Sequence, residues 1–261
     1  MTAPVEVIAN FERNRNSVRD LVNFDSVLTE LVVESFRGLN QKWRTHLEQD
    51  HGMSGTVLDT HGLSGGRQLK MFSTIRENES LKPGFRAIHN LALVALVSFF
   101  SSACRSMFKA VATESFRSGT SALRALPLKL TIGDLMQESD LGSVVAEALE
   151  VSEGFSFQDM KSVGRAFKLV LGREFPRDRH VNDVVLAQAC RHAIVHADGL
   201  VDDKLVHQLR DANPRTLKPE LVLGTSIQFS PEEIEQAGSS MLEYLTFVVT
   251  DVTVLANGES G

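Results

Sequence analysis

A short segment with three polar residues closes one predicted helix in the last third of the chain. Its six residues run from Arg191 to His196, and Gly199 follows three positions later. Arg191 is a permanent cation that can hold a phosphate in bidentate fashion. His196 is a base whose ordinary pKa is about 6.5, close to neutrality. Residues of these two types suit proton transfer beside a bound anion, so we expect the chemistry of the chain to lie here.

The spacing of these two residues limits how they work together. Arg191 and His196 are five positions apart, which on an ideal helix is roughly 140° of rotation and about 7.5 Å of rise. They therefore do not form a side-chain pair of the kind made by residues four apart. Both can border one cleft if the last turn loosens before Gly199.

Two structural interpretations and a metal site are the alternatives for this segment. Arg191 is also suited to an ion pair with Asp198 or Asp202, and His196 to capping the last carbonyls of its helix. His192 and His196 are four apart, as in some zinc sites. No Glu follows His192, and no third ligand has a diagnostic spacing, although His207 lies nearby in the sequence. We therefore expect no metal and no other cofactor.

The composition is typical of an ordered, soluble protein. Of 261 residues, 43% are hydrophobic and 23% are charged, with a net charge of −6. The two cysteines, Cys104 and Cys190, form no disulfide framework, and we expect Cys190 to be a buried thiol. The N-terminus has no secretory pattern, so we predict a cytoplasmic protein. The most apolar run, from Leu91 to Cys104, has about 14 residues against the roughly 20 that span a bilayer, so we expect no membrane segment.

Apolar residues at helical spacing predict an all-α fold. A first helix is expected over residues 5–21, and a second from an N-cap at Asp25 to about Gln49. The longest helix, over residues 85–116, is expected to form the centre of the core. Further helices are predicted at residues 68–77, at 134–148, after a cap at Ser156, after a cap at Asn182 or Asp183, from Asp202 to about Arg210, and at 234–254 after Ser230 and Pro231.

Two segments are expected to be non-helical. Residues 51–66 contain five glycines among Ser, Thr and Asp, which is typical of a loop. Residues 221–229 have the pattern of a small β-hairpin around Gly224. Residues 127–132 show a weak alternation of apolar and polar side chains, which is compatible with an extended segment. We predict two parts: residues 1–84, with N-terminal helices and the Gly-rich loop packed on the main domain, and residues 85–261, the main helical domain.

The segment from Arg191 to His196 resembles the Arg-x4-His motif of HEPN domains, an all-helical family. A small residue and Gly follow the His, a short helix comes next, and Phe229-Ser230-Pro231-Glu232-Glu233-Ile234 opens the final helix. Residues 85–254 resemble such a domain, most closely its RNA-cleaving, toxin-like branches. Where the family often has Asn, this chain has His192.

This resemblance implies a HEPN-like helical bundle with metal-independent endoribonuclease activity. Arg191 and His196 would be catalytic, and His192 would support them. In the family two motifs, one from each protomer, meet across a homodimer interface and form one cleft. The implied partners are RNA, a second copy of the chain and an antitoxin or other regulatory protein, in toxin–antitoxin or phage-defence systems.

A basic segment leads into the motif. Residues 161–191 contain seven Lys or Arg and three acids, a local net charge of +4, so the rest of the chain carries −10. Such a segment favours binding to the phosphate backbone of a nucleic acid. Runs of charge are also typical of solvated helix faces. The candidate RNA-binding residues in it are Arg165, Lys168, Arg173, Arg177 and Arg179.

A second function class is compatible with the same residues. A non-catalytic HEPN-like module would use the fold for dimerisation or for binding RNA or protein, and would retain Arg191 and His196 for folding. The two hypotheses differ in what Arg191→Ala and His196→Ala do to stability, because only a structural role predicts that both variants melt early.

Overall fold

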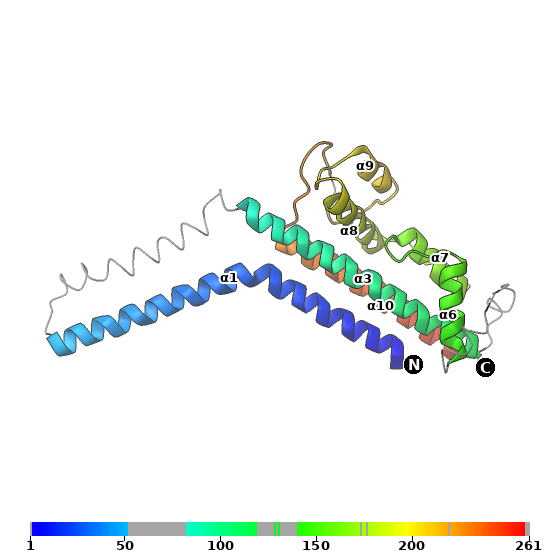
Figure 1. Cartoon of the computed structure of the whole chain (residues 1–261), viewed down its shortest axis with the longest axis horizontal. Coiled ribbons are helices and arrows are strands. Elements are labelled where there is room, and N and C mark those ends of the chain that lie inside the picture. Colours follow the sequence, from blue (N-terminus) through cyan, green and yellow to red (C-terminus); the bar gives the residue numbers. More distant parts are fainter. Residues whose placement is uncertain are drawn as a thin grey trace. The chain divides into compact units, whose positions relative to one another are not determined.

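The architecture comes from a computed structural model, shown in Figure 1. It describes residues 2–51, 82–118, 128, 130, 140–172, 174–175, 177–218 and 220–258. By its internal contacts the chain divides into two units, residues 1–19 with 89–261 and residues 20–88. The motif from Arg191 to His196 lies in the first unit.

The described part of the chain is all-helical, which confirms the predicted fold class. Short connections with capping residues separate most of the later helices. The helices, labelled in Figure 1, are α1 (Thr2–His51), α3 (Lys82–Ser118), α6 (Leu141–Ser152), α7 (Met160–Leu171), α8 (Arg179–His196), α9 (Asp203–Leu209) and α10 (Pro231–Gly258).

Aromatic side chains join the long helices in one core. Phe100 of α3 contacts Phe11 of α1 and Tyr244 of α10, with ring centroids 6.1 and 6.0 Å apart. Phe167 of α7 lies against Phe108 of α3 and against Tyr244. Edge-to-face pairs of this kind add about 0.5–1.5 kcal/mol beyond the burial of their area. The core therefore brings α1, α3, α7 and α10 together and leaves the end of α8 at its border.

One predicted helix boundary is wrong. The chain does not start a new helix at Asp25, because α1 continues without a break from Thr2 to His51. No Gly or Pro lies between residues 5 and 37, so nothing in this stretch interrupts the backbone hydrogen bonds. A residue suited to capping a helix start does not begin a new helix unless a helix-breaking residue, such as Gly or Pro, ends the previous one.

Two other caps lie elsewhere than predicted. Asp159, not Ser156, caps α7, with its carboxylate accepting from Ser162 N at 2.8 Å. Asp178 caps α8 by accepting from Val181 N at 2.9 Å, one turn before the predicted Asn182 or Asp183. An Asp at the end of an irregular segment competes well for the free amides of a helix start, so the earlier acid becomes the cap in α8.

The predicted starts of the last two helices are confirmed. Asp202 caps α9 by accepting from Leu205 N at 2.7 Å. Ser230 and Glu233 form a capping box at the start of α10: Glu233 N donates to Ser230 Oγ, and Ser230 N donates to Glu233 Oε2. The two caps lie at the start of α9 and the start of α10, and so define both ends of the segment from Asp202 to Ser230.

The predicted hairpin at residues 221–229 does not form. Gly224 makes a turn, but Ser226 pairs with Leu200 in an isolated antiparallel bridge, and no strand occurs in the described residues. Other partners take the backbone groups that a second strand would need. Asn90 of α3 donates to Ile227 O at 2.8 Å, and Phe229 N donates to Asn90 Oδ1 at 3.3 Å. The alternating pattern arises because Ile227 and Phe229 are buried, not because two strands pair.

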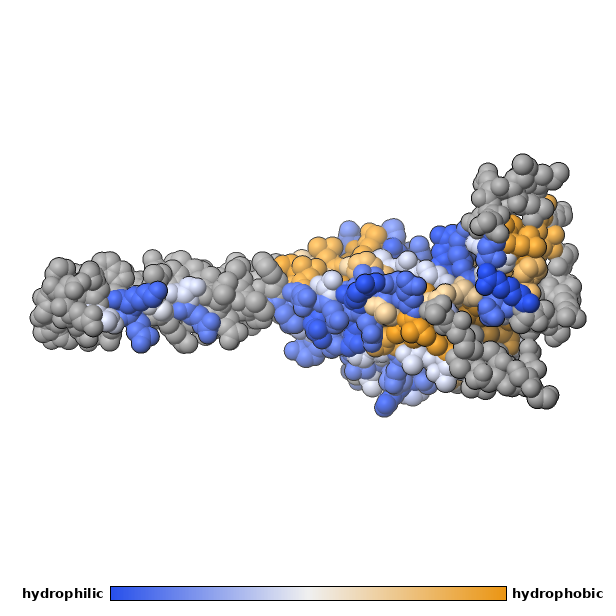
Figure 2. Space-filling model, turned by 90° about the horizontal axis from the view of Figure 1, so that it is seen from below, coloured by the Kyte–Doolittle hydropathy of each residue, from blue (hydrophilic) through white to orange (hydrophobic). Residues whose placement is uncertain are grey.

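The helix α3 contains a long apolar stretch. Residues 87–117 are long and apolar enough to cross a membrane by length and composition alone, longer than the sequence run suggested. Many of these apolar residues, including Leu93, Phe100 and Met107, are buried against the rest of the protein. Leu91 is 62% exposed, and Figure 2 shows apolar patches between polar residues on the face in view.

Several predictions fall outside the described residues. They are the Gly-rich loop after residue 51, the helix at 68–77 and the start of the helix predicted at 134, where the described helix α6 begins at Leu141 behind its cap Asp140. The extended segment at 127–132 is described only at Leu128 and Leu130.

Candidate functional site

The motif occupies the last turns of α8, whose end is tightly defined. Ala197 N and Gly199 N both donate to Ala193 O, at 2.8 and 3.1 Å. Asp198 and Gly199 have φ of 52° and 69°, the left-handed conformation that closes helices. The predicted stop at Gly199 is therefore confirmed. The helix stays regular to His196, so the last turn does not loosen.

The side chains of the motif reach the surface. Arg191 and His192 are half-buried and His196 is exposed. The rings of His192 and His196 lie side by side, with centroids 4.8 Å apart and planes inclined by 50°. This pairing follows from their spacing of four, which places two side chains one above the other on a helix.

The two structural alternatives for the motif are not observed. Among the described residues Arg191 makes no ion pair with Asp198, Asp202 or any other acid. Within the same residues His196 makes no hydrogen bond to a terminal carbonyl of α8. Asp202 instead uses its carboxylate to cap α9. Both motif side chains therefore remain available for another partner.

The helix α9 adds a cation that sequence reasoning missed. Lys204 Nζ donates to His192 Nε2 at 3.0 Å. Burial lowers the pKa of His192 most, followed by the charges of Lys204, His196 and Arg191, and Asp202 raises it only weakly. An ammonium donor requires a neutral acceptor nitrogen, so His192 carries its proton on Nδ1. No sequence signal singles out Lys204, because a lysine in the first turns of a short helix is ordinary surface composition.

The chain after the motif is held by backbone pairing. Ile227 N donates to Gly199 O at 2.7 Å, and Val201 N and Thr225 O pair at 2.9 Å. Gly224 N donates back to Val201 O at 2.8 Å. These bonds fasten the exit from α8 to the segment before α10, and so fix where α9 and Lys204 lie.

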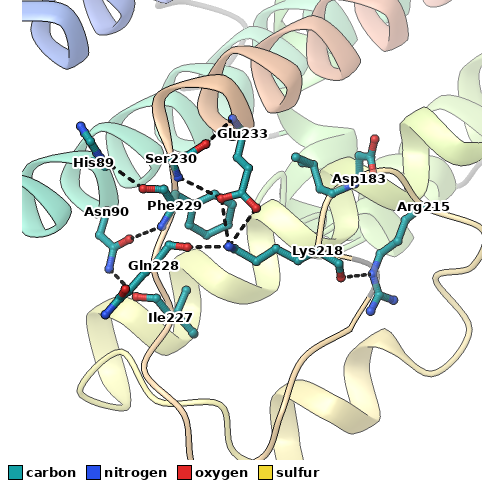
Figure 3. A network of polar contacts seen from close by, with 11 residues as sticks. His89, Asn90, Asp183, Arg215, Lys218, Ile227, Gln228, Phe229, Ser230 and Glu233 are labelled. Carbon is teal, nitrogen blue, oxygen red and sulfur yellow. Dashed lines mark hydrogen bonds and ion pairs between the residues drawn. The ribbon is translucent and has the colours of Figure 1, made fainter.

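A polar network then anchors that segment to three helices (Figure 3). Lys218 Nζ lies 2.9 Å from both carboxylate oxygens of Glu233 and donates to Gln228 O. Its ammonium also lies 4.6 Å from the centre of the Phe229 ring, a cation–π contact. Arg215 donates through Nε to Lys218 O at 3.0 Å. Lys218 and Glu233 neutralise each other within this network, which holds the segment in place.

The buried carboxylate of Asp183 connects this network to α8. It accepts from the backbone amides of Thr216 at 2.8 Å and Leu217 at 2.9 Å, and from the hydroxyls of Thr216 and Ser240. Asn182 beside it donates to Pro214 O at 2.8 Å. Both residues lie on the buried face of the first turns of α8. Their hydrogen bonds fasten the loop after α9 to this helix.

The basic segment is not gathered around the motif. Arg179 is the first residue of α8 and His196 the last, about 25 Å apart along the axis at 1.5 Å per residue. Arg165 stacks 5.8 Å from the Phe155 ring, and Lys168 pairs with Glu174. Arg177 donates to Asn182 Oδ1 at 3.3 Å. These four predicted RNA-binding residues are exposed, and Arg173 lies outside the described residues.

Two further titratable side chains belong to the core. Cys190 is buried, as predicted, and burial raises the pKa of its thiol to about 12, against the charges of Lys218 and Arg215. Tyr244 is buried as well, and burial raises the pKa of its phenol.

His192 and His196 have no third metal ligand nearby in the described part of the chain. Among these residues, no group of three or more His, Cys, Asp or Glu side chains is placed to hold a metal ion. Comparison with protein families, with curated proteins and with solved structures finds no match to this chain. The function is therefore argued from the residues at the end of α8 and their contacts.

Proposed function

We propose that this chain is a metal-independent endoribonuclease of HEPN type that works as a homodimer. The observation that carries the proposal is the state of the motif side chains. Arg191 has no acidic partner in the described part of the chain, and His196, five positions later on the same helix, is exposed. A structural Arg and a structural His would both be expected to have internal partners.

The chemistry requires a base, an acid and a cation. His196 takes the proton of a ribose 2′-hydroxyl, and the 2′-oxygen attacks the adjacent phosphorus. Arg191 stabilises the negative charge that develops on the phosphorane oxygens. The 5′-oxygen leaves with a proton from a second imidazolium, which the motif of the other protomer supplies. The products are a 2′,3′-cyclic phosphate and a 5′-hydroxyl.

The neutral His192 has a supporting role. Its Nε2 accepts from Lys204, and its ring contacts that of His196 at 4.8 Å between centroids. The contact restricts the rotation of His196, so that the base is held toward its substrate. Such preorganisation lowers the barrier because the geometry does not have to be found during the reaction.

The dimer and the biological setting belong to the same proposal. Val195 and Leu200, which flank His196, are 47% and 44% exposed and offer apolar surface to a second protomer. On the basis of the HEPN resemblance, we also propose that the protein works in the cytoplasm as part of a toxin–antitoxin or phage-defence system. An antitoxin or other regulatory protein would be a further partner.

The test compares RNA cleavage by the parent, Arg191→Ala and His196→Ala in the presence of EDTA. We expect the parent to cleave and both variants to lose at least about 100-fold in rate, the scale of removing a general base. Melting temperatures serve as the control, because the structural alternative predicts that both variants unfold early. A parent that needs a divalent metal, or variants as active as the parent, would overturn the proposal.

A further inference from the structure

Four basic side chains from two helices gather at the end of α8. Arg191, His192 and His196 come from α8, and Lys204 comes from α9. Lys204 Nζ lies 3.0 Å from His192 Nε2, and the two histidine rings are 4.8 Å apart at their centroids. Three of the four were expected from the sequence, and Lys204 is the addition made by the fold.

Three acids, Asp198, Asp202 and Asp203, lie close to the cluster in the sequence, but they form no ion pair with its fixed cations in the described part of the chain. Neither Arg191 nor Lys204 forms an ion pair within the described residues. Asp202 is the acid whose charge acts on His192, and its carboxylate is already bonded to Leu205 N. After burial, the positive charges of Lys204, His196 and Arg191 are what lower the pKa of His192, so the cluster disfavours a further cation and favours an anion.

The residue types indicate which anion fits. Arg191 offers planar, bidentate donors, and Lys204 adds a point charge on a flexible stem. Side chains from two helices can contact different oxygens of one tetrahedral group. Lys204 is exposed, and apart from its bond to His192 it is free, in the described part, to turn toward a ligand.

We infer that this cluster binds one backbone phosphate of RNA and that Lys204 is one of its phosphate ligands. The inference rests on the proposed function for its substrate class. The ammonium of Lys204 has three protons, so it can donate to a phosphate oxygen while it keeps its hydrogen bond to His192 Nε2.

The test measures binding of a 2′-O-methyl oligoribonucleotide, which cannot be cleaved through its 2′-oxygen, by fluorescence anisotropy over a series of salt concentrations. We expect Lys204→Gln to weaken binding about 5- to 10-fold and to lower the slope of log K against log salt by about 0.7, as expected for one lost contact to a single strand. Lys204→Arg should bind like the parent. Lys42→Gln, which removes an exposed lysine of α1, should also leave binding unchanged.

The outcomes separate this inference from the proposed function. If Lys204→Gln binds with the affinity and salt slope of the parent, or if the parent does not bind the oligonucleotide, the inference is wrong. If binding depends on Lys204 but the parent cleaves no RNA, the phosphate site stands and the ribonuclease proposal fails. If the parent cleaves RNA while Lys204→Gln binds normally, only the inference fails. Since Lys204 is exposed, the melting temperature of the variant should match that of the parent.

Discussion

His192 is the residue whose charge is most closely controlled in this site. Burial lowers its pKa first, and Lys204, His196 and Arg191 lower it further. The ring is therefore neutral at pH 7 and accepts from Lys204 at Nε2. Because His192 is neutral, the ring beside His196 carries no positive charge. In the proposed reaction His196 must take up a proton, and an uncharged neighbour favours this more than a cation would.

Removing the charge of Lys204 should raise the pKa of His192. We expect Lys204→Gln to shift it toward the ordinary value, although burial and the charges of His196 and Arg191 remain. NMR titration of the His192 ring measures this, with Lys42→Gln as the control that should shift nothing. Because the folded pKa lies below the unfolded one, the unfolded state binds more protons between the two values. His192 therefore lowers the free energy of unfolding as the pH falls through that window. An unshifted His192 pKa in Lys204→Gln would contradict the assigned contact.

Asp183 is the residue on which the placement of the loop after α9 depends most. It is fully buried and accepts from two backbone amides and two hydroxyls. Asp183→Asn replaces one acceptor oxygen by a donor, so we expect a loss of about 2 kcal/mol in the free energy of unfolding. Urea denaturation measures it, and the exposed Asp203→Asn should stay within about 0.5 kcal/mol of the parent. A loss below about 0.5 kcal/mol for Asp183→Asn would mean that the carboxylate does not anchor the loop.

At the scale of elements, the start of α6 packs tightly against α3 at Gly142. A Cβ added at Gly142 would lie 2.6 Å from Thr113 Cγ2 and 3.3 Å from Thr113 Cα. We expect Gly142→Ala to cost about 1–3 kcal/mol, because backbone and side chain must both shift. Gly164, inside α7, has nothing within 4 Å of its added Cβ, so Gly164→Ala should instead stabilise by about 0.5–1 kcal/mol. Thermal melts of the two variants that move in the same direction would contradict this packing.

The helical elements could be predicted from the sequence where local signals decide them. The starts of α9 and α10 depend on Asp202 and Ser230, whose side chains bond to nearby amides, so sequence reasoning found them. The start of α8 did not follow, because Asp178 and Asp183 are both good caps and the buried contacts of Asp183 decide between them. Boundaries set by tertiary contacts are not visible in a local pattern.

The same limit applies to the hairpin and to the site. Ile227 and Phe229 alternate with polar residues because both are buried, but the partner of their backbone is Asn90, 137 positions away from Ile227. Arg191, His192 and His196 were found because they share one helix. Lys204 was not, since its contact with His192 depends on how α9 returns across the end of α8.

At the scale of the whole molecule, the proposed reaction needs a second copy of the chain. The ring beside His196 in the same chain is His192, and its lowered pKa makes it a poor proton donor at neutral pH. The acid of the proposed reaction therefore comes from the other protomer. We expect the protein to be a dimer with twice the chain mass of 28.7 kDa in light scattering at micromolar concentration. A chain that stays monomeric while it cleaves RNA would contradict the two-protomer site.

The chemistry of the RNA ends produced in EDTA tests the proposed reaction at its reacting atoms. We predict that the parent cleaves single-stranded RNA to fragments with 2′,3′-cyclic phosphate and 5′-hydroxyl ends. We also predict that the parent spares the same sequence with 2′-O-methyl riboses, and that His196→Ala leaves the RNA intact. Fragments with 5′-phosphate ends, or a parent that leaves RNA intact, would contradict it.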